Sequence, residues 1–506
     1  MLSVLAVLPC ARPLHSLEYP LLDARTLRAS PRSDAGPPAR YFTQRRDHFS
    51  ANDTATWQQA YYVNDKYFTG DGPVFLCVGG EGPPIDGSAV THSVHCNNAV
   101  EFLPASKALM FAVEHRYYGC HNMSACPYSE KDPEPLRWLS SRQALADLAT
   151  FHAYVTSAYG LTTQNKWVSF GGSYPGMLAG WFRVMYPELV HASVSSSAPV
   201  HAKLEMTEYF DIAARAYSLT SVGGSPACEA AIRHGHDHIG SLWNTADGRQ
   251  QLATMFKSVK AHGAEWLANR TGRAQFAGNG VIYFPSQGND PACTTYACNI
   301  ERICSVMTDG RDPLTCLASL ANTLLDSPAA PRPVRASAPP PVSSAARPLH
   351  TSLHTSLHTS LHEELDYWGY QTCNEFGFYQ TCDVGSQCFF VQGYNRLSDD
   401  DAFCLSEYGR TPADIQASID ATNAHYGSLR PDLAHNATRV LYVNGDVDPW
   451  SGLSILSPPS ALLPTMMVPG ASHHAWTHPS ANTDQPSVVR ARGLIRMQVA
   501  KWLATD

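Results

Sequence analysis

Short, mostly apolar runs that alternate with helical stretches restrict the fold of this chain more than any other feature. The runs lie at residues 74–78, 108–113, 167–170, 190–194, 440–443 and 465–468. Helical periodicity covers residues 139–158, between the second and third runs, and resumes from Met177 to about Tyr186, after the third. A buried strand reads as a continuous apolar run, and parallel strands are joined through helices. We therefore predict a parallel sheet that is covered by helices on both faces.

This alternation is interrupted between residues 203 and 415. Helical segments and cysteine-containing loops dominate there, so we predict an inserted, mainly helical domain. Within it, residues 327–362 are rich in Pro, Ala and Ser and repeat the sequence His-Thr-Ser-Leu. Such a segment cannot bury a core, and we predict that it is disordered. The sheet-forming core then comprises residues 40–202 and 416–506, and residues 1–39 form a separate N-terminal segment.

The sequence Gly-Gly-Ser-Tyr-Pro-Gly at residues 171–176 connects a predicted strand to a predicted helix. A serine at such a sharp turn needs small neighbours, and the pattern approximates the Gly-Xaa-Ser-Xaa-Gly nucleophile elbow. Pro175 departs from it, but proline suits the first helical turn, where its N–H is not needed. The sequence therefore favours Ser173 as a nucleophile. The alternative is a flexible connection with no chemical role.

A nucleophilic serine needs a histidine that takes its proton and a carboxylate that orients the histidine. On a nucleophile-elbow sheet, the acid and then the histidine follow the serine in the chain, each on a loop after a strand. Asp446 and Asp448 follow the run 440–443, and His473 and His474 follow the run 465–468. Order and position both fit, although the residues alone leave open which Asp and which His would act.

Such a site also needs two backbone N–H groups that bind the developing oxyanion. One is expected from Tyr174, the residue after the nucleophile. The other is expected from the glycine loop that follows the first apolar run, and Gly80 is the candidate in the sequence Gly79-Gly80-Glu81.

Two other classes of protein compete with this interpretation. A metal-dependent hydrolase is suggested by His234, His236 and His238, and by the histidines that recur every four residues from His350 to His362. No His-Glu-Xaa-Xaa-His sequence occurs, and no metal or other cofactor is expected. A catalytically inactive binding protein on the same fold is the second alternative. The net charge of −8 argues against nucleic acid as a partner.

Four Asn-Xaa-Ser/Thr sequences point to the secretory route. They begin at Asn52, Asn122, Asn269 and Asn436, which are the expected glycosylation sites. The first eleven residues are a weak candidate for a signal peptide, because the apolar run lacks a basic start. No uncharged apolar run approaches the roughly 18 residues that a membrane helix needs.

Fourteen cysteines occur in local groups, which fits disulfides that pin loops. Cys10 lies in the candidate signal peptide, and Cys77 lies in a predicted buried strand. We therefore expect these two to be unpaired. The other twelve would form six disulfides between Cys96 and Cys404, most of them in the inserted domain.

Several motifs resemble the Pro-Xaa carboxypeptidase family of serine peptidases. They are Gly79-Gly80-Glu81-Gly82 and the Ser173 turn, together with residues 114–119, 139–147, 194–200, 370–379 and 444–450. The resemblance extends from about residue 40 to the C-terminus. It implies an α/β-hydrolase fold with an inserted, disulfide-braced helical cap.

The resemblance also resolves the choices left open above. It implies that Asp448, which precedes Pro-Trp, is the acid and that His473 is the histidine, with Asp446 and His474 as neighbours. Peptides would be the substrates, cleaved from a chain end through an acyl-enzyme, next to proline in some members of the family. The resemblance is compatible with a homodimer and with a secreted, lysosomal or vacuolar location. It does not decide between a carboxypeptidase and a dipeptidyl-peptidase.

Overall fold

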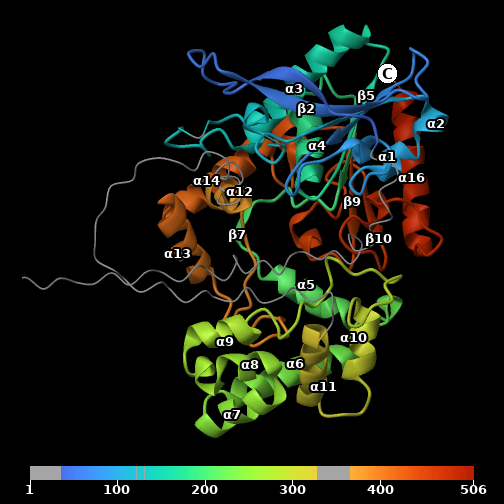
Figure 1. Cartoon of the computed structure of the whole chain (residues 1–506). Coiled ribbons are helices and arrows are strands. Elements are labelled where there is room, and N and C mark those ends of the chain that lie inside the picture. Colours follow the sequence, from blue (N-terminus) through green and yellow to red (C-terminus); the bar gives the residue numbers. More distant parts are fainter. Residues whose placement is uncertain (1–35, 121, 130, 327–364, 506) are drawn as a thin grey trace, which may run out of the picture.

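A computed structural model describes residues 36–120, 122–129, 131–326 and 365–505 (Figure 1). The candidate signal peptide, Cys10 and the predicted disordered segment 327–362 lie outside these residues. No helix in the described ranges is both long enough and apolar enough to cross a membrane.

Eight strands form one sheet in the order β1-β2-β4-β3-β5-β6-β9-β10. The strands are β1 (Arg40–Arg45), β2 (Thr56–Asn64), β3 (Val74–Val78), β4 (Leu109–Val113), β5 (Trp167–Gly172), β6 (Ala192–Ser196), β9 (Val440–Gly445) and β10 (Thr465–Val468). β2 pairs antiparallel with β1 and β4, and the other neighbours are parallel. All residues of β3, β4, β5, β6 and β9 are buried, as in parallel sheets covered on both faces.

Alternate side chains of β3 enter hydrophobic clusters on opposite faces of the sheet. Leu76 packs in a cluster with α3 (Ser141–Tyr159) and α4 (Tyr174–Met185). Phe75 packs in another cluster with α1 (Asn97–Val100), α2 (Leu103–Ser106) and α16 (Pro486–Leu503). The strand order and the helices on both faces define an α/β-hydrolase fold, which confirms the predicted fold class.

A second lobe is built from helices inserted after β6, and Figure 1 shows it below the sheet. Its helices are α5 (Glu208–Ala216), α6 (Pro226–Leu242), α7 (Ala246–Met255), α8 (Lys257–His262), α9 (Arg270–Ala277), α10 (Ile300–Met307) and α11 (Pro313–Asp326). Ile232, Ile239, Leu252 and Leu317 lie in its own hydrophobic cluster. The lobe therefore has a core that is separate from those of the sheet.

The chain after this lobe packs on the sheet, and its helices extend past residue 415, the predicted end of the insertion. It contains α12 (Tyr367–Gln371), a π-helical turn (Thr372–Phe376), β8 (Gly377–Tyr379), α13 (Leu397–Tyr408), α14 (Pro412–Tyr426) and α15 (Pro431–His435). β8 pairs with β7 (Lys203–Glu205) in a second, two-stranded sheet. Phe376 and Tyr426 belong to the cluster that contains α4, and the ring of Tyr426 stacks on Trp181 with the centroids 3.8 Å apart. The interval 203–415 thus comprises a helical lobe and a segment that lies against α4.

Six disulfides are present in the described residues. They are Cys77–Cys96, Cys120–Cys126, Cys228–Cys304, Cys293–Cys298, Cys373–Cys404 and Cys382–Cys388. The expectation that Cys77 is unpaired was wrong. Its side chain points to the face of the sheet where Cys96 precedes α1, so a buried strand position still has a partner. Cys316, expected to be paired, is instead a buried free cysteine on α11.

We predict that the denatured chain exposes no more than two titratable thiols, Cys316 and Cys10. Thiol titration in denaturant without reductant measures this number. Replacing Cys316 with serine is expected to lower the count by one, whereas replacing Cys77 is expected to raise it by freeing Cys96. Three or more thiols in the wild-type chain would contradict the disulfide pattern.

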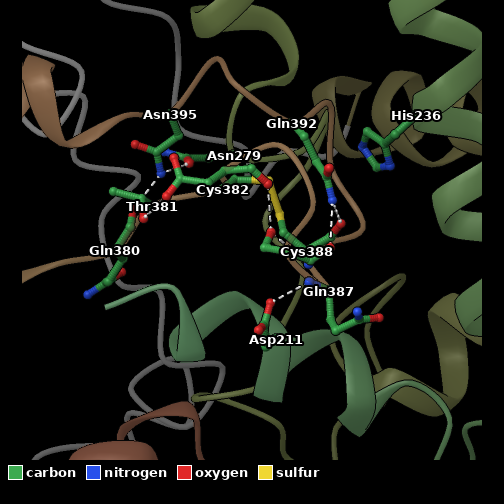
Figure 2. The surroundings of a disulfide bond; sticks show 12 residues. Asp211, His236, Asn279, Gln380, Thr381, Cys382, Gln387, Cys388, Gln392 and Asn395 are labelled. Atoms are coloured by element: carbon green, nitrogen blue, oxygen red, sulfur yellow. Dashed lines mark hydrogen bonds between the residues drawn. A yellow bond between two sulfur atoms is a disulfide. The ribbon is translucent and has the colours of Figure 1, made fainter. Parts of the chain in front are cut away.

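The disulfide Cys382–Cys388 closes a loop that joins separate parts of the insertion (Figure 2). Gln387, inside this loop, donates its backbone N–H to the Asp211 carboxylate on α5 (2.8 Å). At the start of the loop, the N–H of Cys382 donates to the carbonyl of Asn395 (3.1 Å). The closed loop thereby connects α5 to the segment that follows β8.

Candidate active site

Ser173 occupies the tight turn between β5 and α4. It has φ 63° and ψ −133°, in a region that residues other than glycine seldom adopt. Its N–H donates to the carbonyl of Ser196 on β6 (2.9 Å), and its carbonyl accepts from the N–H of Met177 in α4 (3.0 Å). Strained backbone held in place by its surroundings is typical of functional sites. The predicted elbow geometry is therefore present at this serine.

The small neighbours of Ser173 are required by close packing. A Cβ atom on Gly171 would lie 2.2 Å from the carbonyl oxygen of Pro175, and one on Gly172 would lie 2.8 Å from the ring of His474. Pro175 stands in the first turn of α4, where its missing N–H leaves no helical bond unmade. The glycines thus allow β5 and α4 to meet at the turn.

Asp448 and His473 lie in contact on neighbouring loops, after β9 and β10 respectively. Asp448 is fully buried; one carboxylate oxygen accepts from the N–H of Trp450 (3.0 Å) and the other lies 2.9 Å from Nδ1 of His473. The second ring nitrogen, Nε2 of His473, is buried and has no hydrogen-bond partner among the described residues. This arrangement fixes Nδ1 as the protonated nitrogen and leaves Nε2 able to accept a proton.

The competing residues of the same loops have other partners. Asp446 accepts a hydrogen bond from the N–H of Gly470 (2.6 Å). His474 has its ring Nδ1 3.0 Å from the hydroxyl of Thr477, and its ring centroid lies 4.6 Å from that of His473. The structure therefore pairs Asp448 with His473, and leaves Asp446 and His474 beside the pair.

The buried carboxyl group of Glu81 interacts with groups of the Ser173 turn and with His473, which affect its pKa. Burial raises the pKa of Glu81, while its own N–H, the His473 imidazole, the Ser173 hydroxyl and the Tyr174 N–H lower it. The elbow and the Asp448–His473 pair thus both influence the pKa of one buried carboxyl group.

The glycine loop after β3 packs against the Ser173 turn. The N–H of Gly79 is used by the carbonyl of Val113 (2.9 Å), and a Cβ on Gly80 would lie 2.2 Å from the Pro175 ring. The Gly80 amide, expected as the second oxyanion donor, stays a prediction.

Two polar side chains hold the Tyr174 ring in place. Its hydroxyl accepts from Nε2 of Gln371 (3.0 Å) and lies 3.0 Å from Nε2 of His115. Burial lowers the pKa of His115 to about 4, and its Nδ1 lies 2.5 Å from the carbonyl of Arg116. Neutral His115 therefore donates through Nδ1 and accepts from Tyr174 through Nε2. Gln371 and His115 were not singled out from the sequence, although both lie in the family motifs.

The helical lobe contacts the loops that carry the acid and the histidine. The carbonyl of Gln287 accepts from the N–H of His473 (3.1 Å), and its side-chain oxygen accepts from Trp450 (3.0 Å) and from the Tyr209 hydroxyl (2.8 Å). The rings of Tyr209 and Phe378 pack edge-on against Trp450, with centroids 5.4 and 5.6 Å away. Aromatic side chains of the insertion therefore border the candidate site.

The histidines considered as metal ligands have other surroundings. His236 is buried, its Nδ1 lies 2.9 Å from the carbonyl of Ile232, and its Nε2 accepts from the N–H of Val281 (3.4 Å). No group of three or more His, Cys, Asp or Glu side chains suited to a metal occurs within the described ranges. The repeated histidines from His350 to His362 lie outside them. His236 thus serves the packing of the helical lobe.

Comparison with known proteins covers nearly the whole chain. Residues 44–495 match the family described as "Serine carboxypeptidase S28". "Thymus-specific serine protease" of Mus musculus is 32% identical over 93% of this chain and 88% of its own length. The human protein of the same name is 31% identical over 94% and 89% of the two chains. "Lysosomal Pro-X carboxypeptidase" of Bos taurus is 26% identical over 92% and 88%.

Proposed function

This chain belongs to the serine carboxypeptidase S28 family, and we propose that it is a serine exopeptidase that hydrolyses peptides through an acyl-enzyme on Ser173. Family membership supports serine peptidase activity. The observation that carries the assignment of residues is the buried Asp448–His473 pair beside the strained Ser173 turn. Each of the three positions follows a strand in the order expected of this fold.

In the proposed mechanism, Ser173 attacks the scissile carbonyl while Nε2 of His473 accepts its proton. Asp448 holds the imidazole in the required tautomer and stabilises the positive charge that forms on it. His473 then gives the proton to the leaving amine, and a water molecule hydrolyses the acyl-enzyme by the same route. Nε2 of His473, which has no hydrogen-bond partner among the residues that the structure describes, is available for this task.

The oxyanion would be bound by backbone N–H groups. Tyr174 supplies one, and the glycine loop at Gly80 supplies the second. Donors fixed by the surrounding packing stabilise developing charge without reorganising, which is a large contribution to catalysis.

The contact of the helical lobe with the site supports the proposal that the enzyme cleaves peptides at chain ends. The Gln287 loop of the helical lobe touches both His473 and Trp450, so the lobe lies directly against the proposed machinery. The aromatic rings of Tyr209, Phe378 and Trp450 provide an apolar border that suits a compact residue such as proline. The name of a relative, "Lysosomal Pro-X carboxypeptidase", also favours cleavage of the bond next to proline.

A panel of short peptides tests the exopeptidase proposal. The peptides contain Pro or Ala next to the bond that is expected to be cleaved. They are blocked at the amino end, the carboxyl end or both, and cleavage is followed by mass spectrometry. We expect cleavage when one end is free and a loss of roughly 100-fold or more in kcat/KM when that end is blocked, because a missing partner leaves site groups unpaired. The end that must be free distinguishes a carboxypeptidase from a dipeptidyl-peptidase. Efficient cleavage of doubly blocked peptides would refute the exopeptidase proposal.

We further infer that the protein enters the secretory route and acts outside the cell or in a lysosome or vacuole. The asparagines of all four glycosylation sequences, Asn52, Asn122, Asn269 and Asn436, are exposed in the structure. Six disulfides fit an oxidising compartment. Relatives named as lysosomal enzymes are compatible with this location.

A further inference from the structure

A closed ring of hydrogen bonds surrounds the acid and the histidine, and one member of the ring comes from the helical lobe. One carboxylate oxygen of Asp448 lies 2.9 Å from Nδ1 of His473, and the other accepts from the N–H of Trp450 (3.0 Å). The indole N–H of Trp450 donates to the side-chain oxygen of Gln287 (3.0 Å), and the carbonyl of Gln287 accepts from the N–H of His473 (3.1 Å). Gln287 therefore joins the acid loop to the histidine loop by a second route.

The side-chain amide of Gln287 has a defined orientation. An indole N–H can only donate a hydrogen bond, so the amide atom that faces Trp450 is the oxygen. The same oxygen accepts from the hydroxyl of Tyr209 (2.8 Å), whose ring packs edge-on against Trp450. Two donors thus meet at one acceptor, and the ring of hydrogen bonds requires an oxygen at this position.

The helical lobe determines where Gln287 lies. Before it in the chain, the carbonyl of Pro285 accepts from the hydroxyl of Tyr217, at the end of α5 (3.4 Å). After it, the side-chain oxygen of Asn289 accepts from the N–H of Ile300, the first residue of α10 (2.9 Å). Because the chain on both sides of Gln287 is bound to helices of the lobe, the two oxygens of Gln287 are presented by the lobe to the loops of the site.

We propose that Gln287 is a positioning residue for the reaction, through which the helical lobe holds Asp448 and His473 in the relative position that activates Ser173. The inference rests on the proposed function, because it assumes that these three residues form the triad. A single hydrogen bond between two side chains leaves their loops free to turn about it, whereas the ring also fixes the backbone of His473. The lobe therefore completes the catalytic site in addition to bordering it.

Direct contacts between the two loops limit the expected effect of losing Gln287. The N–H of Val447, the residue before the acid, donates to the carbonyl of Ala471 (3.2 Å). The carbonyl of Val447 also accepts from the hydroxyl of Ser286 in the lobe (2.6 Å). Without the Gln287 oxygen the loops should therefore shift and not separate. A misplacement of about 1 Å costs roughly 100-fold in rate, which sets the upper size of the effect.

A pair of substitutions at Gln287 tests whether its oxygen positions the triad. Gln287→Met has a similar length but lacks the oxygen, whereas Gln287→Glu keeps an oxygen that can accept from both donors. Two quantities are measured: the rate constant for labelling of Ser173 by a small fluorophosphonate, which needs the triad but no peptide binding, and kcat and KM for one peptide that the enzyme cleaves. We expect Gln287→Met to lower the labelling rate constant and kcat by roughly 10- to 100-fold, with little change in KM.

Gln287→Glu is expected to restore most of both rates, because it restores the acceptor. The matched control is Gln250→Met, the same substitution at an exposed position of α7 in the same lobe, and it should follow the wild type. A merely structural role would give a different result. Partial unfolding lowers the final extent of labelling, but the molecules that remain folded react at the wild-type rate.

A labelling rate constant of Gln287→Met equal to that of wild type would therefore overturn the inference, and so would equal losses in Gln287→Met and Gln287→Glu. If Gln287→Met does not fold, Trp450→Phe removes the donor from the other end of the same hydrogen bond, and its labelling rate constant should fall in the same way. Labelling of the wild type separates the two proposals. A wild type that is not labelled refutes the proposed function, whereas a labelled wild type with an equally reactive Gln287→Met refutes this inference alone.

Discussion

Replacing Ser173 with alanine is expected to lower kcat by about 10⁶-fold, the effect of losing a serine nucleophile together with its proton-transfer partner. The folded state should be unaffected, because alanine keeps the Cβ atom and the same backbone strain at φ 63°. Substrate binding should also persist, since Asp448, His473 and the backbone donors remain. Peptide hydrolysis and thermal unfolding are measured on the same preparation.

The exposed Ser305 on α10 provides a matched control, because its hydroxyl donates only to the carbonyl of Arg302 in its own helix (2.8 Å). Ser305→Ala should retain wild-type kcat. Residual activity of Ser173→Ala within about tenfold of wild type would mean that another group forms the covalent intermediate, because triad residues act as a unit.

Asp448→Asn is expected to lower kcat by about 10⁴-fold through the wrong tautomer of His473. Trp450 N–H already donates to one oxygen of residue 448, so the amide nitrogen of asparagine would face Nδ1 of His473. Nδ1 would then accept a hydrogen bond, and the proton of the neutral ring would sit on Nε2. A protonated Nε2 cannot take the proton of Ser173, which is why the loss is large although the shape is retained.

Asp446→Asn is the paired comparison, because Asp446 lies two residues away on the same loop. Its carbonyl oxygen can still accept from the N–H of Gly470, so the loop should keep its conformation. We expect kcat within roughly tenfold of wild type, as for substitutions that leave the reacting groups in place. A larger loss for Asp446→Asn than for Asp448→Asn, in variants of equal stability, would reverse the assignment of the acid.

Continuous apolar runs predicted the central strands well. The run 74–78 coincides with β3, and the run at 167–170 forms the first four residues of β5. The antiparallel edge strand β1 was not predicted, because only two of its six side chains are buried and its pattern is weak. Cys77 shows the limit of the same reasoning. Because Cys77 lies in a buried strand, the sequence predicts that it has no disulfide partner. Its partner Cys96 comes from a segment whose position only the fold determines.

The candidate site also contains some residues that the sequence predicts and others that it does not. Ser173 and the loops that carry Asp448 and His473 are predictable because each follows a strand, and the carboxyl ends of parallel strands meet at one edge of the sheet. The choice of Asp448 over Asp446 and of His473 over His474 came from the family resemblance. Gln287 and Gln371 are not predictable, because they reach the site from the insertion through tertiary packing. Glu81 lies within the predicted glycine loop, but its burial depends on the packing of that loop in the fold.

Labelling by a fluorophosphonate probe tests the central claim, that Ser173 is the nucleophile of an active serine hydrolase. We expect covalent labelling of the folded wild type at Ser173, located by mass spectrometry of the modified peptide. We expect no labelling of Ser173→Ala of equal thermal stability. Equal labelling of the two proteins, or no labelling of folded wild type, would contradict the claim and favour an inactive hydrolase fold that binds peptides without cleaving them.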